Sequence, residues 1–162
     1  MHRLIVACAL VLSLAACGPR EAAAPKTPDA TAAEAKAFLE KNKTEPGVVT
    51  LPSGLQYKIV RSGPADGPHP GLHDDVSSHY EGKFINGEVF DSSYERGVPS
   101  VFKPSGVVPG WTEALQLMRP GDEWMLYLPP ELGYGADGGG RVPPNSVLTF
   151  KLEVLDLRKA GG

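Results

Sequence analysis

The 162-residue sequence has almost no cysteine and no concentration of charge of one sign. Its two cysteines, Cys8 and Cys17, both lie near the N-terminus, so the rest of the chain cannot be built on a disulfide framework. The formal net charge is only -3, and Lys and Arg are scattered along the chain rather than clustered. Because a nucleic-acid-binding surface needs a basic patch or stripe, we expect no nucleic-acid partner.

The sequence also lacks an apolar run long enough to span a membrane. The run at residues 4–12 falls well short of the ~20 residues that a membrane-spanning helix needs. It follows a basic start and precedes small residues, which is the pattern of a cleaved secretory signal. Residues 14–17 (Leu-Ala-Ala-Cys) resemble a bacterial lipobox, in which the cysteine is lipidated. We interpret residues 1–16 as a lipoprotein signal peptide and Cys17 as the lipidation site; the alternative is an ordinary signal peptide that happens to contain Cys17.

What is abundant is glycine and proline, with 19 and 16 residues, in no periodic order. This indicates a loop-rich domain rather than collagen or a helical bundle. Residues 17–30 have little to bury and are interpreted as a flexible tether. Residues 31–47 begin with the capping-box pattern Thr31-Ala-Ala-Glu34 and predict one short helix. We interpret this helix as a lid on the domain, because it is too short for a dimerisation arm. We therefore expect a monomer. Residues 48–158 are assigned to the main domain and residues 159–162 to a tail.

Within the main domain, apolar residues follow the periods of both strands and a helix. The pair Asn86-Gly87 predicts a two-residue β-hairpin loop. Trp111, Leu115 and Met118 fall at i, i+4 and i+7 of a helix of about two turns. These patterns predict an α+β fold, a curved antiparallel β-sheet wrapped around one short α-helix. The residues expected to share strand faces are Leu55, Tyr57 and Ile59; Val76, Ser78, Tyr80, Gly82 and Phe84; Trp124, Leu126 and Leu128; and Leu148, Phe150, Leu152 and Val154.

Six ordered motifs between about Leu51 and Leu157 resemble one family, the FKBP-type peptidyl-prolyl cis-trans isomerases. The sequences of these motifs are similar to those of the bacterial, surface-directed lipoprotein branch of that family, which implies a location in the cell envelope. Gly18, directly after Cys17, gives no retention signal of the Asp type and favours the outer membrane. The motifs are Leu-Pro-Ser-Gly-Leu-Gln-Tyr (51–57), His-Tyr-Glu-Gly (79–82), Gly-x-Val-Phe-Asp-Ser-Ser-Tyr-Glu-Arg-Gly (87–97), Val-Val-Pro-Gly-Trp-Thr-Glu-Ala-Leu (107–115), Pro-Pro-Glu-Leu-Gly-Tyr-Gly (129–135) and Val-Pro-Pro-Asn-Ser-Val-Leu-Thr-Phe (142–150).

The resemblance implies an aromatic pocket that binds a prolyl residue and interconverts the cis and trans forms of X-Pro bonds, without a cofactor or metal. Trp111 corresponds to the pocket floor, and Asp91 and Tyr134 to its two polar groups; these three are the expected catalytic residues. Arg96 matches a position that pairs with and orients Asp91. The substrate-binding residues that the resemblance implies are Tyr80, Phe90, Arg96, Val107, Val108, Val142 and Phe150.

The expected reaction is consistent with the chemistry of the peptide bond. Rotation about it meets a barrier of ~18–20 kcal/mol that arises from amide resonance, and X-Pro isomers exchange over tens to hundreds of seconds. A dry aromatic pocket disfavours the polar planar state relative to the twisted state, and the Tyr134 hydroxyl can hold a flanking carbonyl. The expected partners are unfolded or partly folded polypeptides that contain proline, and macrolide immunosuppressants are candidate ligands.

Simpler interpretations of the same residues stay open. Each aromatic residue could belong to the core alone, and Asp91 could cap the turn at Ser92-Ser93. The pocket could hold proline segments as a chaperone without turnover, or the fold could be purely structural. Three departures from the family pattern bear on substrate preference. Ser100 stands at an aromatic wall position, which we expect to leave that side of the pocket smaller and wetter. The other two are the segment Lys103-Pro104-Ser105 and a short Gly-rich loop that carries Arg141.

Overall fold

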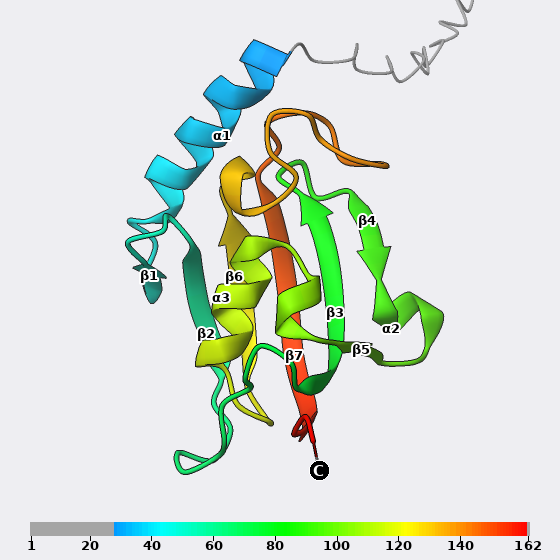
Figure 1. Cartoon of the computed structure of the whole chain (residues 1–162). Helices are drawn as coiled ribbons and strands as arrows, with labels where there is room; N and C mark the ends of the chain where they lie inside the picture. The colour runs from blue at the N-terminus through cyan, green and yellow to red at the C-terminus, as the bar shows by residue number, and fades with distance from the viewer. Residues whose placement is uncertain (1–27, 162) are drawn as a thin grey trace, which may run out of the picture.

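The computed structural model describes residues 28–161, with side chains from residue 31 onward. The expected signal peptide, Cys17 and most of the expected tether lie outside the described residues. Seven strands form one antiparallel sheet in the order β1-β2-β6-β7-β3-β4, and β5 pairs with β3 (Figure 1). The strands are β1 (Val48–Thr50), β2 (Gln56–Arg61), β3 (Asp75–Phe84), β4 (Val89–Ser92), β5 (Ser100–Phe102), β6 (Glu123–Leu128) and β7 (Leu148–Arg158); the helices are α1 (Pro28–Asn42), α2 (Ser93–Arg96) and α3 (Pro109–Leu117), with 3-10 turns η1 (Pro104–Gly106) and η2 (Pro130–Leu132).

The core lies between α3 and the inner face of the sheet (Figure 1). Trp111, Leu115 and Met118 are all buried, which confirms the predicted helical stripe. Along β3 and β7 buried residues alternate with more exposed ones, because successive side chains of a strand point to opposite faces. The predicted α+β fold, with a curved antiparallel sheet against one short helix, is confirmed. No helix among residues 28–161 is both long and apolar enough to cross a membrane.

The β3–β4 hairpin forms where Asn86-Gly87 predicts it, but its loop is longer than expected. Phe84 N–H donates to the Glu88 carbonyl, and the Phe84 carbonyl accepts from Gly87 N–H, each at 2.9 Å. Gly87 has a φ of 87°, the left-handed conformation that glycine adopts without steric cost. The loop is therefore the three-residue type that ends in a left-handed glycine. The prediction of a two-residue loop was wrong.

The N-terminal helix is present, with bounds that differ from those expected. It begins at Pro28, within the residues interpreted as tether, and proline is well suited to the first turn of a helix. It ends at Asn42 rather than near residue 47. Beyond Asn42 the chain closes into tighter turns, in which Thr44 N–H donates to the Lys41 carbonyl and Glu45 N–H to the Asn42 carbonyl.

The C-terminal end of helix α1 packs on the outer face of the sheet at β2 and β6, which changes the burial of β2. The Asn42 amide donates to Gln56 Oε1 at 2.8 Å, and Gln56 donates to the Leu39 carbonyl at 3.0 Å. Gln56 is consequently buried, whereas Ile59 on the inner face is 48% exposed. Alternation along β2 thus predicted the faces of the side chains, but not which of the faces would be covered.

The C-terminal residues are anchored by Asp74, a buried carboxylate just before β3. Asp74 accepts hydrogen bonds from Ala160 N–H at 2.8 Å, Gly71 N–H at 2.6 Å and Lys159 Nζ at 2.9 Å. These bonds, the one from Ala160 foremost, lower the pKa of Asp74 to about 2.

Replacing Asp74 by asparagine is expected to destabilise the domain in a pH-dependent way. Because the folded-state pKa lies below the unfolded value of ~3.9, the carboxylate stabilises the fold above pH ~4, and this stabilisation disappears as the pH falls towards 2. Urea unfolding at pH 6 should therefore separate wild type from Asp74→Asn, and the two should converge near pH 2. Asp66→Asn, in an exposed loop, is the matched control; a difference that persists undiminished at pH 2 would contradict the assignment.

Candidate active site

A cavity of about 260 Å³ opens between α3 and the inner face of the sheet. Eight of its ten lining residues are among those expected from the sequence, and they come from β3, β4, β7, α3 and the loops beside them. The chain thus brings together side chains that lie up to seventy positions apart. The lining residues are Tyr80, Phe90, Asp91, Phe102, Gly106, Val107, Val108, Trp111, Tyr134 and Phe150.

Trp111 is the centre of the aromatic arrangement. It is only 3% exposed and lies in the first turn of α3. The rings of Tyr80, Phe102 and Phe150 each lie 5.2 Å from the Trp111 ring between centroids, at interplanar angles of 79–86°. Edge-to-face packing of this kind is favourable for aromatic pairs. The four rings hold one another in place and form an apolar floor and walls.

Phe102 is the wall residue that the sequence did not reveal. The expectation was that Ser100 leaves one side of the pocket smaller and wetter. Instead β5 pairs with β3 so that Phe102 lies opposite Val76, and its ring reaches Tyr80 at 5.6 Å as well as Trp111. Ser100 and Phe102 are two residues apart and share a face of the strand. Strand alternation from Ser100 was the signal that could have identified Phe102.

The polar part of the cavity is a cluster of Asp91, Tyr80 and Arg96. The Tyr80 hydroxyl donates to Asp91 Oδ2 at 2.5 Å, and Arg96 donates from Nη1 to Asp91 Oδ1 and from Nη2 to the Tyr80 oxygen at 2.9 Å. Arg96 does not line the cavity itself. It pairs with Asp91, as the family pattern implies, and its Nη2 also donates to Ser100 Oγ at 3.3 Å.

Helix α2 explains how Arg96 reaches Asp91. Ser92 caps this single turn, with its hydroxyl accepting from Glu95 N–H at 3.3 Å, and Gly97 ends it in a left-handed conformation. The alternative role of Asp91 as the cap of this turn is wrong, because Ser92 takes that role. Asp91 is left to face the cavity.

The cluster determines the charge in the cavity. Burial by itself would raise the pKa of Asp91, but hydrogen bonds from Tyr80 and Arg96 together hold this pKa below its ordinary value. Burial, together with the bond to Asp91, raises the pKa of Tyr80. At neutral pH the cavity therefore contains a carboxylate whose oxygens are occupied by donors, next to a neutral phenol.

Tyr134 lies at the mouth of the cavity and is 44% exposed. Its ring packs against Gly139, where an added Cβ would lie 2.9 Å from Tyr134 Cδ1. Arg141 donates to the Phe90 carbonyl at 3.2 Å and so ties the Gly-rich loop to β4. These contacts give the unusual loop composition a physical role, because only a residue without a side chain fits beneath Tyr134.

Val142 takes a different position from that expected. It is buried in the hydrophobic core and is not among the ten lining residues. Gly139 N–H donates to its carbonyl at 2.9 Å, and Val142 N–H donates back to Gly139 at 2.8 Å. Val142 therefore supports the loop that carries Tyr134 rather than contacting the cavity.

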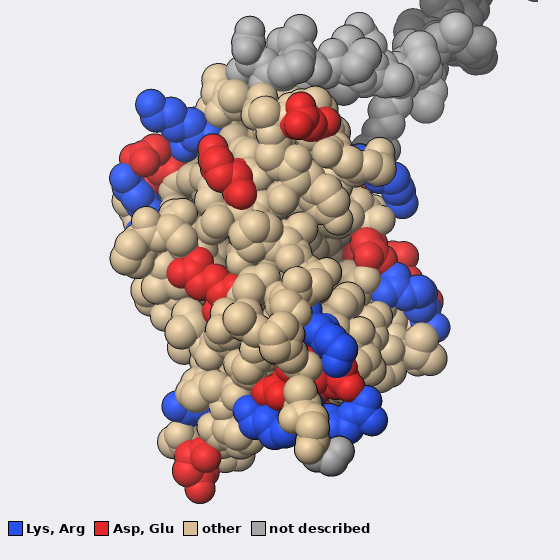
Figure 2. Space-filling model, in the orientation of Figure 1, with Lys and Arg blue, Asp and Glu red and all other residues tan. Residues whose placement is uncertain are grey.

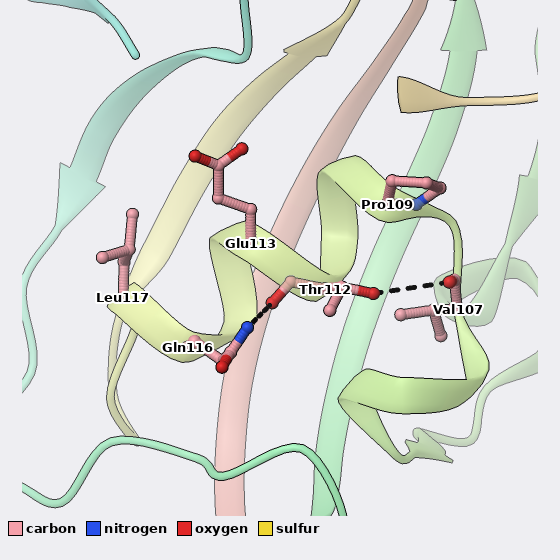
Figure 3. Close-up of a pocket in the computed structure, with 6 residues that line it drawn as sticks. All are labelled: Val107, Pro109, Thr112, Glu113, Gln116 and Leu117. Carbon is pink, nitrogen blue, oxygen red and sulfur yellow. Dashed lines mark hydrogen bonds between the residues drawn. The ribbon is translucent and has the colours of Figure 1, made fainter. Parts of the chain in front are cut away.

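Charged groups are otherwise sparse around the site. In Figure 2 charged side chains gather towards the rim of the visible face, with Lys and Arg interspersed among Asp and Glu, and few lie over its centre at α3. Within residues 28–161 no group of three or more His, Cys, Asp or Glu side chains could hold a metal ion. A larger depression of about 530 Å³ lies on the outer face of α3 (Figure 3), but it has no aromatic lining residue.

Two family models match the chain. Residues 67–155, more than half of the chain, match the FKBP-type peptidyl-prolyl cis-trans isomerase model. Residues 16–59 match the model of the domain amino terminal to FKBP-type peptidyl-prolyl isomerase. The second match includes α1 and β1, so these elements also correspond to a region found beside the isomerase domain in relatives.

Individual relatives agree with the family models. The chain is 48% identical over 129 residues to the peptidyl-prolyl cis-trans isomerase Mip of Coxiella burnetii, which covers 79% of this chain and 55% of that protein. It is 46% identical over 142 residues to the outer membrane protein MIP of Legionella longbeachae, covering 87% of this chain and 60% of that one. The chain thus spans less than two thirds of the length of these curated relatives.

A solved structure extends the likeness to the fold. A peptidyl-prolyl cis-trans isomerase from Pseudomonas syringae matches with a TM-score of 0.76 and 31% identity, covering 84% of this chain and 99% of that one. All ten residues that line the aromatic cavity lie within residues 67–155, the part of the chain that matches the isomerase model. The chain belongs to the family of FKBP-type peptidyl-prolyl cis-trans isomerases.

Proposed function

We propose that this protein is a peptidyl-prolyl cis-trans isomerase and that the cavity around Trp111 is its active site. The observation that carries the proposal is the cavity itself, in which four mutually packed aromatic rings surround a space of about 260 Å³. The only ionised side chain among its lining residues, Asp91, is already bonded by Tyr80 and Arg96. Such a space suits a prolyl ring and the apolar twisted imide.

The proposed mechanism uses no covalent step. The prolyl ring lies on the Trp111 indole between the other aromatic rings, and the cavity excludes water from the imide. Because the twisted imide has lost resonance, it carries less charge on its oxygen and is less disfavoured by apolar surroundings than the planar form. The Tyr134 hydroxyl, at the mouth, donates to a carbonyl that flanks the bond. Lowering the barrier by ~4 kcal/mol would accelerate exchange about a thousandfold.

The proposed substrates are proline-containing segments of unfolded or partly folded polypeptides in the bacterial envelope. Support for this location comes from the lipobox-like residues 14–17 and from the Legionella longbeachae relative, which is named an outer membrane protein. We propose that Cys17 carries the lipid anchor, with the outer membrane favoured, and that residues 17–27 tether the domain. We also propose that the protein is a monomer and that macrolide immunosuppressants are candidate ligands of its cavity.

Exchange spectroscopy on short X-Pro peptides tests the proposed activity. Wild type is expected to accelerate cis-trans exchange, and Tyr134→Phe to reduce kcat/KM by roughly 3- to 10-fold, since one neutral hydrogen bond is worth ~0.5–1.5 kcal/mol. Tyr127→Phe, on the outer face of β6 beside Phe38, is the matched control and should retain full activity. Peptide binding without any acceleration by wild type would identify a binding module and reject the enzyme.

A further inference from the structure

The outer face of α3 carries a second depression, adjacent to the aromatic cavity. Its volume of about 530 Å³ is twice that of the cavity. Val107 lines both spaces, so the two lie next to each other at this residue. We call this depression the outer groove, and its lining residues are Val107, Pro109, Thr112, Glu113, Gln116 and Leu117 (Figure 3).

Two of the polar side chains of the outer groove are engaged by backbone carbonyls, and the third, Glu113, is a carboxylate. The Thr112 hydroxyl donates to the Pro104 carbonyl at 2.6 Å, and the Gln116 amide donates to the Thr112 carbonyl at 2.9 Å. Glu113 accepts one hydrogen bond, from the Ser53 hydroxyl at 2.6 Å. A carboxylate has about four lone-pair sites, so this bond leaves Glu113 able to accept more.

The apolar part of the outer groove is exposed. Leu117 is 42% exposed, and Pro109 is also exposed at the other end of α3. In Figure 3 Glu113 and Leu117 project to the same side of the helix, whereas the Thr112 hydroxyl is directed back at the Val107 backbone. The groove therefore combines aliphatic surface with one carboxylate.

The size of the groove fits a short piece of extended chain. Helix α3 has nine residues, which gives it a length of ~13 Å. An extended polypeptide advances ~3.3–3.6 Å per residue, so about four residues would lie along the helix. A chain whose proline occupies the aromatic cavity can reach the groove with its neighbouring residues, because the two spaces share the lining residue Val107.

We propose that the outer groove binds the client segment that flanks the proline, with an aliphatic residue against Leu117 and a Lys or Arg opposite Glu113. This inference rests on the proposed function and adds to it a preference for sequence several residues away from the X-Pro bond. A client with both features is held at two connected sites, which favours polypeptides over isolated prolyl dipeptides.

The test compares a four-residue X-Pro peptide with two longer peptides. One is extended by five residues on the N-terminal side and the other by five residues on the C-terminal side, and each extension carries a Leu and a Lys. At least one extension should raise kcat/KM about tenfold in wild type, as expected for burial of one aliphatic side chain with a nearby charge pair. Leu117→Gln should remove most of this gain and leave the short peptide unaffected. Glu113→Gln should weaken only the Lys-bearing peptide. Leu155→Gln, at a similarly exposed leucine on β7, is the matched control and should keep the gain.

Calorimetric measurement of the affinity of the same peptides distinguishes rejection of the groove proposal from rejection of the proposed isomerase activity. If no extension improves either kcat/KM or affinity, or if Leu117→Gln keeps the full gain, the groove proposal is rejected even where short peptides are isomerised. If wild type accelerates no peptide, the proposed activity fails, and the affinities of extended and short peptides still decide the groove. Unfolding midpoints of the three variants ensure that each is compared in the folded state.

Discussion

Trp111→Ala is expected to lower the free energy of unfolding by about 3–5 kcal/mol and to abolish most of the isomerase activity. Trp111 is almost fully buried, and its ring contacts those of Tyr80, Phe102 and Phe150. Its removal leaves a void that these rings cannot fill without giving up their own packing. Since small domains have a total stability of ~5–15 kcal/mol, urea unfolding and exchange kinetics should both be measured at low temperature.

Trp124→Ala is the matched control, because the chain has two tryptophans and both are buried. Trp124 stacks on Tyr57, with ring centroids 4.4 Å apart, and does not line the aromatic cavity. It should lose a similar amount of stability while keeping its activity. An equal loss of activity in the two variants would show that activity follows stability, and would remove the argument for Trp111 as the cavity floor.

Asp91→Ala is expected to reduce kcat/KM by roughly 10- to 100-fold. The substitution leaves the Arg96 guanidinium and the Tyr80 hydroxyl without their shared acceptor. Hydrogen bonds to charged groups contribute ~1.5–3 kcal/mol, and each 1.36 kcal/mol of transition-state stabilisation is a factor of ten. The Tyr80 ring keeps its packing on Trp111 and Phe102, but its hydroxyl loses its acceptor, so the substitution changes the charge of the cavity more than its shape.

The measurement is kcat/KM for a short X-Pro peptide, with Asp66→Ala as the control. Asp66 lies in an exposed loop, and its removal should leave the rate unchanged. Arg96→Met should reproduce part of the loss, because Arg96 donates to both Asp91 and the Tyr80 hydroxyl without lining the cavity itself. Full activity in Asp91→Ala would mean that the cluster serves folding alone.

Much of the fold and the site follows from local patterns in the sequence. The stripe of Trp111, Leu115 and Met118 has the period of a helix, and the alternation along β3 has the period of a strand, because backbone geometry alone fixes these spacings. The ordered motifs placed eight of the ten cavity residues. The family resemblance, rather than periodicity, identified these residues, because they come from three strands, α3 and the loops beside them.

The tertiary structure decided which residues meet. A period of two assigns a side chain to a face, but it does not say which strand lies next to it or what covers that face. Pairing of β5 with β3 brings Phe102 into the cavity, where its ring supplies the aromatic wall that Ser100 cannot. Packing of α1 on the outer face buries Gln56, while Ile59 on the inner face stays exposed. These outcomes depend on contacts between elements far apart in the chain, which local spacing does not encode.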